Sequence, residues 1–276
     1  MIKSFSKINL SLKVIKKLPN KLHEIQSNII LLNLYDEIKV NKTEKKKDII
    51  IFKGKFNKFV NKKKNSVTES LKILRSCKII NSYYKIIINK KIPVFSGLGG
   101  GTANAASIFN FFIKKKNNSI LKMFEKKIGS DFRLFFNKQS YQVSLQKLIN
   151  YNKKYNLFFV LVYPNLKCST KEIYSKVYKY SAKSRIDFSK LKSKRKFLEL
   201  MKNEQNDLQE LVIKKFPAIE KIINFINIQK GCSFARMTGS GSVCFGVFNS
   251  QRLAKAALAR VKKKYAAYWC KVSRTI

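Results

Sequence analysis

Hydrophobic and polar residues follow each other along the chain in two kinds of pattern, and the first kind predicts strands. Residues 4–14 alternate loosely between apolar and polar side chains, and short apolar stretches recur after them. The stretch at residues 157–163 is apolar throughout and is closed by Pro164, as in a buried strand. Further strands are predicted at residues 29–34, 37–40, 49–52, 84–88 and 243–247.

Helices are predicted where apolar residues recur on one helical face. Asn65 and Thr102 are residue types that cap helix N-termini, and Gly129 suits a helix C-terminus. Pro217 divides the helical stretch at residues 208–226. The polar, lysine-rich segment at residues 181–196 predicts a mobile loop. Shared faces are formed by Val67, Leu71 and Leu74, by Ala105, Ile108 and Phe112, and by Leu253, Ala257 and Val261.

These elements predict an α+β fold, because strands and helices mix without strict βαβ repetition. No internal repeat is present in the sequence. We place a domain boundary near Lys154, which predicts domains at residues 1–154 and 155–276.

The composition is that of a folded protein with an extreme positive charge. Of its 276 residues, 45% are hydrophobic, and Lys and Arg number 59 against 15 Asp and Glu, a formal net charge of +44. Such a charge suits nucleic-acid binding. The lysines, however, are spread over predicted loops and helix ends, among many Asn and Ile residues. This distribution favours a coding bias toward lysine, with the excess charge on solvent-exposed faces, over a dedicated nucleic-acid surface. Short lysine runs lie at residues 45–47, 62–64, 114–116 and 262–264.

The cysteines and the apolar stretches bear on the cellular compartment of the protein. The five cysteines are widely spaced and include no CxxC pair, so neither a disulfide framework nor a zinc site is indicated. We find no apolar stretch of signal-peptide or membrane-span length. We therefore expect a cytoplasmic protein.

The segment PVFSGLGGGTANAA at residues 93–106 is the strongest candidate for chemistry. A predicted strand precedes its four clustered glycines, and a predicted helix follows them. Glycines let the backbone approach an oxyanion, and a helix N-terminus presents N–H groups and a partial positive charge to it. A flexible turn before a core helix is the alternative. The segment lacks the lysine of a GxxxxGK[ST] loop and is not GxGxxG after a first strand.

Five segments in order resemble the GHMP small-molecule kinases, and among them the family that phosphorylates 4-diphosphocytidyl-2-C-methyl-D-erythritol. They read SKIN at residues 6–9, GLGGGTANAA at 97–106, GSD at 129–131, NDL at 206–208 and MTGSGSVCFGVF at 237–248. The likeness runs from Lys7 to Phe248, which is nearly the whole chain. Five ordered matches are far more specific than any one of them.

The resemblance implies the fold and the reaction. The implied fold has an N-terminal ATP-binding domain, like the second domain of a ribosomal protein, and a C-terminal ferredoxin-like α/β sandwich. The implied reaction transfers a phosphoryl group from ATP, with Mg²⁺, to the 2-hydroxyl of the cytidyl alcohol, a step of the non-mevalonate isoprenoid pathway. The implied partner is this small molecule, with no specific nucleic acid, no membrane, and a monomer or weak homodimer.

The resemblance also implies the site residues. Asp131 would be the catalytic base, assisted by Lys7. The ATP phosphates would lie on Gly97, Leu98, Gly99, Gly100, Gly101, Thr102, Ala103 and Asn104. The substrate would contact Asn9, His23, Thr170, Tyr174, Gly239 and Ser240. No metal ligand is identified.

Taken one by one, these residues also have ordinary structural explanations. Asp131 suits a turn after glycine, and Lys7 is one of many lysines. His23 suits an exposed loop, Tyr174 a helix face, and Asn9 an edge strand or turn. Only the family resemblance raises them above these explanations.

The chain departs from the family pattern at several positions. Leu22 stands where the family has a tyrosine that stacks on the base, and we expect this loss of one stacking face to weaken nucleotide binding by about 1–3 kcal/mol. Thr102 and Ala103 replace a Ser-Ser pair, Phe95 and Ser96 replace two small residues, and Arg133 replaces a proline. None removes a group that the chemistry requires.

Two other functions stay open from the sequence. One is a GHMP kinase acting on another small alcohol, such as homoserine or mevalonate, against which His23 and the three consecutive glycines argue. The other is a non-catalytic, basic RNA-binding protein on the same fold. It predicts steeply salt-dependent RNA affinity and no phosphoryl transfer.

Overall fold

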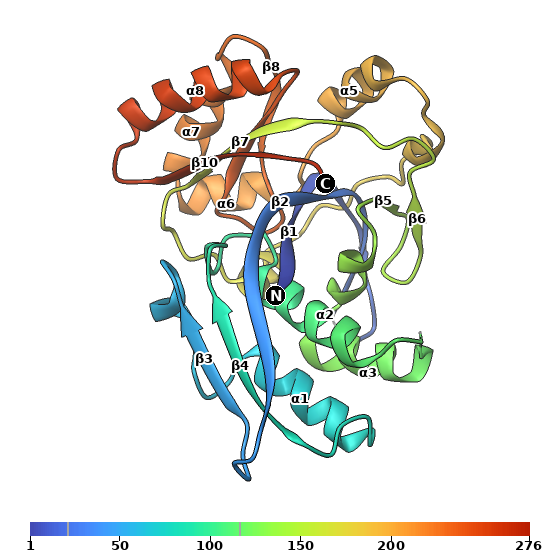
Figure 1. The fold of residues 1–276 in the computed structure, drawn as a ribbon. Coiled ribbons are helices and arrows are strands. Elements are labelled where there is room, and N and C mark those ends of the chain that lie inside the picture. The colour runs from blue at the N-terminus through green and yellow to red at the C-terminus, as the bar shows by residue number, and fades with distance from the viewer. Residues whose placement is uncertain (21, 116) are drawn as a thin grey trace. The chain divides into compact units, whose positions relative to one another are not determined.

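The computed structural model describes residues 1–20, 22–115 and 117–276 (Figure 1). Lys21 and Lys116, the latter in the lysine run at residues 114–116, lie outside the described residues. The strands are β1 (Ile2–Lys17), β2 (His23–Thr43), β3 (Ile49–Lys53), β4 (Tyr83–Asn89), β5 (Gln139–Gln142), β6 (Leu148–Asn150), β7 (Phe158–Tyr163), β8 (Cys232–Met237), β9 (Cys244–Phe248) and β10 (Trp269–Arg274). The α-helices are α1 (Ser66–Ser76), α2 (Gly100–Phe112), α3 (Asn118–Ile128), α4 (Thr170–Ser175), α5 (Lys194–Asn203), α6 (Gln209–Lys215), α7 (Ala218–Asn227) and α8 (Gln251–Lys264).

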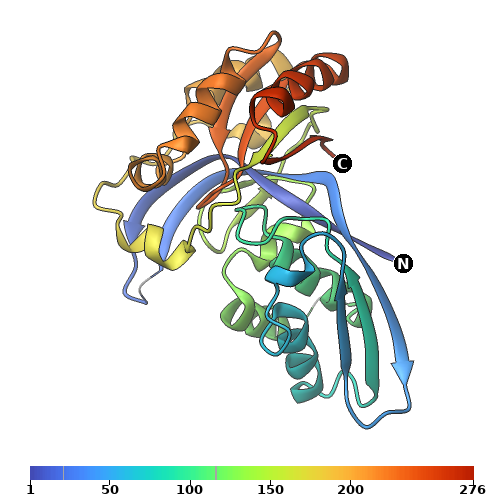
Figure 2. The ribbon, with the colours of Figure 1, turned by 90° about the vertical axis from the view of Figure 1, so that its left-hand side faces the viewer.

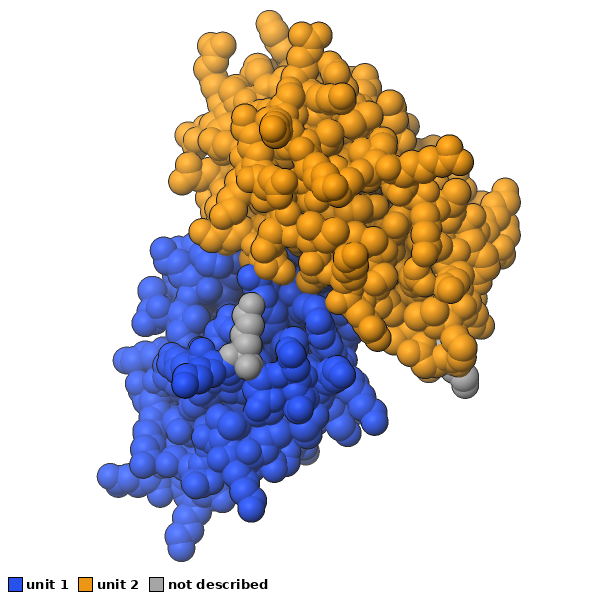
Figure 3. Space-filling model, turned by 90° about the vertical axis from the view of Figure 1, so that its right-hand side faces the viewer, with its two compact units in different colours: residues 1–7, 34–94, 99–136 blue, residues 8–33, 95–98, 137–276 orange. Residues whose placement is uncertain are grey.

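The described residues form two compact units, each assembled from separate segments of the chain (Figure 3). Unit 1 comprises Met1–Lys7, Leu34–Val94 and Gly99–Phe136. Unit 2 comprises Ile8–Asn33, Phe95–Leu98 and Asn137–Ile276. Strands β1 and β2 each contribute residues to both units. The units are therefore not separated at one position of the sequence, and the domain boundary near Lys154 stays a prediction.

Unit 1 is a small sheet packed against three helices. The second half of β2 pairs antiparallel with β4, from Glu37 opposite Asn89 to Thr43 opposite Tyr83, and β3 runs parallel to β4. Apolar faces of α1, α2 and α3 meet the sheet in one core, because their apolar residues recur at helical spacing. That core includes Ile38, Leu71, Leu74, Ile86, Ile88, Ala105, Ile108, Phe109 and Phe124.

Unit 2 contains an antiparallel sheet in the order β10-β7-β9-β8. As the uniform apolar stretch predicts, β7 is almost wholly buried in the middle of this sheet. Helices α7 and α8 pack their apolar faces on it through Ile222, Ile226, Ala257 and Val261. The first half of β2 also pairs with β5 in this unit, from Ser27 opposite Gln142 to Ile30 opposite Gln139.

Most predicted elements are confirmed, together with the α+β class. The Asn65 side chain accepts from the N–H groups of Val67 and Thr68 and caps α1. Gly129 follows the last residue of α3 with φ +145°. Pro217 separates α6 from α7.

Two predictions differ from the structure. The strands predicted at residues 29–34 and 37–40 are one strand, β2, because the intervening Asp36 is fully buried and accepts the N–H groups of Lys91 and Ile92. The loop predicted at residues 181–196 includes a 3-10 turn, Phe188–Lys190, and the start of α5. Phe188 is fully buried. The lysines around it give the segment a polar composition, so the sequence did not indicate this buried residue.

Candidate functional site

The glycine-rich segment begins helix α2. Gly99 precedes the helix in the left-handed conformation, with φ +69°, and its carbonyl accepts the N–H of Ala103 at 2.8 Å. The helix starts at Gly100, so the prediction that Thr102 is the cap is wrong. Glycine enters this conformation at little cost, and the helix is therefore capped three residues earlier than expected, at Gly99 instead of Thr102. The first amides of α2, together with the helix dipole, make this end suited to an anion.

Gly99 is also required by the space around it. A Cβ atom there would lie 2.6 Å from Cζ of Phe135 and 3.3 Å from Cγ and Cε of Lys7. The aliphatic stem of Lys7 therefore lies against the turn that starts the helix. This contact brings Lys7, from β1, to the glycine segment within unit 1.

Asp131 lies at the same end of α2. The Thr102 hydroxyl donates to Oδ1 of Asp131 at 3.4 Å. Lys7 is only 6% exposed, and burial lowers the pKa of its ammonium group, while the negative charge of Asp131 acts in the opposite direction. Unit 1 thus brings together a carboxylate, a hydroxyl and a buried lysine beside a helix N-terminus.

Asn104, predicted to bind the nucleotide, lies in a buried polar network of unit 1. Its amide group donates to Oγ of Ser4 and to Oδ2 of Asp36, both at 3.0 Å. Its oxygen accepts from Nζ of Lys90 at 3.1 Å, and Lys90 is ion-paired with Asp36. A Cβ atom on Gly100 would lie 3.4 Å from Nζ of Lys90. The network therefore packs against the first turn of α2 on its buried side.

The second glycine turn, at residues 238–241, lies in unit 2 and is held from several sides. Within the turn, the N–H of Gly241 donates to the Thr238 carbonyl at 3.0 Å. The Asn206 amide group donates to the carbonyls of Met237 at 2.9 Å and Gly239 at 2.8 Å. Gly239 and Gly241 both have positive φ, at +56° and +87°, which favours glycine at these two positions.

The first residues of the glycine segment, Gly97 and Leu98, belong to unit 2 and lie against this turn. The Ser96 carbonyl accepts the N–H of Val243 at 3.1 Å. A Cβ atom on Gly97 would lie only 2.3 Å from the Thr238 carbonyl oxygen, so the backbones approach as closely as glycine allows. Leu98 is fully buried, so its side chain anchors the segment.

Three more predicted substrate contacts lie near this turn. The backbone N–H of Asn9 donates to Oγ1 of Thr238 at 2.9 Å, and its side-chain amide donates to Oγ of Ser27 at 2.7 Å. The hydroxyls of Thr170 and Ser240 are 2.9 Å apart. Unit 2 therefore brings Asn9, Thr170 and Ser240 to one glycine turn.

His23 and Tyr174 are paired in unit 2, where the turn between β1 and β2 meets helix α4, drawn yellow in Figure 2. Their ring centroids are 5.2 Å apart and the ring planes are tilted by 33°. Burial, and then the positive charge of Lys17, lower the pKa of His23. At neutral pH the imidazole is uncharged and offers one hydrogen-bond donor and one acceptor.

Comparison with known proteins now identifies the family. A family model described as "GHMP kinases C terminal" matches residues 187–267. The 4-diphosphocytidyl-2-C-methyl-D-erythritol kinase of Pelagibacter ubique is 38% identical over 282 residues, covering 100% of this chain and 98% of that protein. The chain belongs to the 4-diphosphocytidyl-2-C-methyl-D-erythritol kinase family. The enzyme of the same name from a Wolbachia of Drosophila simulans is 30% identical over 97% of this chain and 96% of its own length.

Solved structures agree on the GHMP kinase fold. A crystal structure of 4-(cytidine 5'-diphospho)-2C-methyl-D-erythritol kinase superposes with a TM-score of 0.72 at 18% identity, covering 99% of this chain and 98% of that chain. A mevalonate kinase superposes with a TM-score of 0.69 at 19% identity, covering 99% and 98%. The family resemblance is thus confirmed, as is the GHMP kinase fold with mixed α+β content that it implied.

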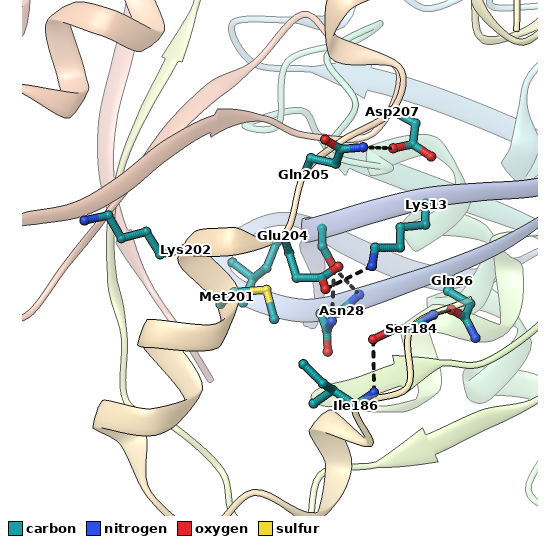
Figure 4. Close-up of polar contacts among 12 residues, drawn as sticks. Lys13, Gln26, Asn28, Ser184, Ile186, Met201, Lys202, Glu204, Gln205 and Asp207 are labelled. Carbon is teal, nitrogen blue, oxygen red and sulfur yellow. Dashed lines mark hydrogen bonds and ion pairs between the residues drawn. The ribbon is translucent and has the colours of Figure 1, made fainter. Parts of the chain in front are cut away.

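The fourth of these family segments, NDL at residues 206–208, ties unit 2 together. Besides the Asn206 contacts to the glycine turn, Oδ2 of Asp207 accepts the N–H of Val14 at 2.7 Å, and Oδ1 accepts from Nε2 of Gln205 at 2.8 Å. Nearby, Lys13 and Glu204 form an ion pair at 3.1 Å (Figure 4). These contacts fix the segment onto β1, and this explains a motif to which the sequence alone assigned no role.

The sequence missed Lys90 and Asp36. Lys90 is one of many lysines, and Asp36 interrupts a predicted strand, so neither spacing nor residue type marks them. Among the described residues, no group of three or more His, Cys, Asp or Glu side chains could hold a metal ion. In the described part of the chain, no helix is both long enough and apolar enough to span a membrane.

Proposed function

We propose that this protein transfers the γ-phosphoryl group of ATP to the 2-hydroxyl of 4-diphosphocytidyl-2-C-methyl-D-erythritol, a step of isoprenoid precursor synthesis. The observation that carries the proposal is the meeting of Lys7, Thr102 and Asp131 at the N-terminus of α2, in a chain that belongs to this kinase family. Phosphoryl transfer needs bound phosphates, a group that takes the proton of the attacking hydroxyl, and positive charge near the transferred group. Unit 1 supplies all three.

The ATP phosphates bind at the start of α2. The amides of the first turn point out of the helix end, and Gly101 is exposed there. Gly99, Gly100 and Thr102 shape this end, whereas Ala103 and Asn104 support it from their buried positions.

Mg²⁺ fits this site as a partner of the phosphates. The Thr102 hydroxyl and the Asp131 carboxylate offer two oxygen ligands of the kind that Mg²⁺ prefers, and Mg²⁺ commonly combines one or two protein oxygens with phosphate and water. When bound, the ion neutralises phosphate charge.

Asp131 accepts the proton of the 2-hydroxyl as that oxygen attacks the γ-phosphorus. Lys7 lies near this carboxylate, whose negative charge raises the pKa of the lysine against the larger, opposite effect of burial. The Thr102 hydroxyl, which donates to Oδ1, restricts the orientation of the carboxylate.

Unit 2 binds the cytidyl part of the substrate. Neutral His23 pairs with the edge of the cytosine, and Tyr174 stacks on its ring. Asn9, Thr170, Gly239 and Ser240, grouped at the second glycine turn, contact the rest of the substrate. Both substrates are small phosphate esters, and we place the reaction in the cytoplasm.

The test incubates the purified protein with Mg-ATP and the cytidyl alcohol, and follows the product by mass spectrometry. We expect a product heavier by one phosphoryl group, and no product from homoserine or mevalonate. Asp131→Asn keeps the shape of the side chain but removes the base, so kcat should fall by about 10²- to 10⁴-fold. Glu199→Gln, at an exposed ion pair on α5, is the matched control and should leave kcat unchanged. Full turnover by Asp131→Asn would refute the role of this residue, and no product from the wild-type protein would refute the function.

A further inference from the structure

The segment that follows α4 is attached to both long strands in unit 2. The N–H of Ser181 donates to the Val14 carbonyl on β1 at 2.8 Å. The N–H of Ser184 donates to Oε1 of Gln26 on β2, also at 2.8 Å. Tyr180, the residue just before the first of these contacts, is therefore held beside the strands that carry His23.

Tyr180 places a second tyrosine ring next to His23. The ring centroids of Tyr180 and His23 are 6.5 Å apart, with the planes tilted by 31°. Tyr174 lies at 5.2 Å with a nearly equal tilt of 33°, so His23 has a tyrosine within aromatic contact range from each of two segments.

His23 and Tyr180 differ in how much of each residue is exposed to solvent. His23 is only 8% exposed, whereas Tyr180 is 46% exposed. A large aromatic side chain that stays half exposed beside a buried, neutral imidazole offers a flat apolar surface to a ligand that reaches the imidazole. Leu22, the neighbour of His23, is 44% exposed and aliphatic, so it cannot stack on a base.

We propose that Tyr180 stacks on the pyrimidine base of the substrate that His23 binds, and thereby supplies the aromatic surface that Leu22 lacks. The inference rests on the proposed function, because it takes a cytidine nucleotide as the ligand. Tyr180 is in this sense a specificity-determining residue. Stacking of a base on an aromatic side chain is sequence-tolerant and strong enough to change affinity by about tenfold.

Tyr178 provides a matched control two residues away. Tyr178 is 62% exposed, and the ammonium groups of Lys179 and Lys214 lie 5.7 Å and 5.9 Å from the centroid of its ring. Tyr178 and Tyr180 are therefore the same residue type in the same exposed segment, but only Tyr180 lies next to His23 in the contacts found among the described residues.

The experiment measures CDP binding by calorimetry and steady-state kinetics with the cytidyl alcohol. Tyr180→Ala should weaken CDP binding and raise the KM for the alcohol by about tenfold, with the KM for ATP and the melting temperature unchanged. Tyr180→Phe and Tyr178→Ala should match the wild type. Leu22→Tyr in the Tyr180→Ala background should restore most of the lost affinity, because it places a ring beside His23 again.

Each result decides the matter. Equal CDP affinity of Tyr180→Ala and the wild type, or an equal loss in Tyr178→Ala, would overturn the inference. A loss in Tyr180→Phe as large as in Tyr180→Ala would show that the hydroxyl acts, and would overturn stacking. If the wild type binds CDP but transfers no phosphoryl group, the proposed function fails while the binding data still test Tyr180.

Discussion

The Thr102 hydroxyl donates to the Asp131 carboxylate at 3.4 Å. This bond connects the first turn of α2 with the segment that follows the end of α3 at Gly129. Thr102 lies inside the helix and is not its cap. Its hydroxyl is available to the carboxylate because the helix is capped three residues earlier, at Gly99. One hydroxyl therefore lies beside both the helix end and the candidate base.

Thr102→Val should lower kcat by about tenfold, because a hydrogen bond to a charged group contributes about 1.5–3 kcal/mol and this one is long. Valine keeps the shape of threonine without its hydroxyl. Thr102→Ser keeps the hydroxyl and should retain most of the activity. Steady-state kinetics of both variants at saturating substrates measures the effect, and a fully active Thr102→Val would mean that the hydroxyl has no part in turnover.

Gly99→Ala should destabilise the protein by about 1–3 kcal/mol, since an L-residue is strained at φ +69° and its Cβ would overlap Phe135. Gly101→Ala is the control, because it lies in the same glycine run without a positive φ and its Cβ would meet Oγ of Ser66 at an ordinary 3.6 Å. Chemical denaturation of both variants separates them. Equal stabilities would contradict the conformation assigned to Gly99.

Asn206→Ala should destabilise unit 2 by about 1–3 kcal/mol, because the carbonyls of Met237 and Gly239 lose their donor. Asn206→Asp should be at least as harmful, since a carboxylate cannot donate and would face two carbonyl oxygens. Thermal unfolding and the KM for the cytidyl alcohol report the two effects. An aspartate variant as stable as the wild type would show that the amide does not hold the glycine turn.

His23 should titrate below its ordinary pKa of 6.5, because burial and Lys17 disfavour the charged imidazole. Between the folded pKa and 6.5, the unfolded chain binds more protons than the folded chain. The free energy of unfolding therefore falls as the pH is lowered through this window. The chain has a single histidine, so one imidazole signal in proton NMR gives the pKa directly. His23→Gln should remove this part of the pH dependence, and a signal that titrates above 6.5 would contradict the prediction.

Elements defined by neighbouring residues were predicted well. Asn65 caps α1 because its side chain reaches N–H groups only two and three residues away. The apolar stretch of β7 is buried as its uniform pattern predicts. Such features depend on local periodicity and backbone chemistry, which the order of residues carries directly.

Elements that depend on contacts with residues far away in the sequence were not predicted correctly. Asp36 interrupts the apolar pattern of β2, but the strand continues because backbone N–H groups of Lys91 and Ile92 and the side chain of Lys90 satisfy the carboxylate. Phe188 is buried inside a segment that its lysines had marked as a loop. In both cases a tertiary contact outweighs the local preference.

The order of residues alone determined that a helix follows the glycine-rich segment, the α+β class and the kinase family, because these follow from short segments and their order along the chain. Only the tertiary structure decided that the stem of Lys7 lies on Gly99, that Thr102 bonds Asp131, and that Asn104 joins Lys90 in a buried network. Residues so far apart meet through the packing of whole strands and helices, and the directions of their side chains depend on that packing and not on local spacing.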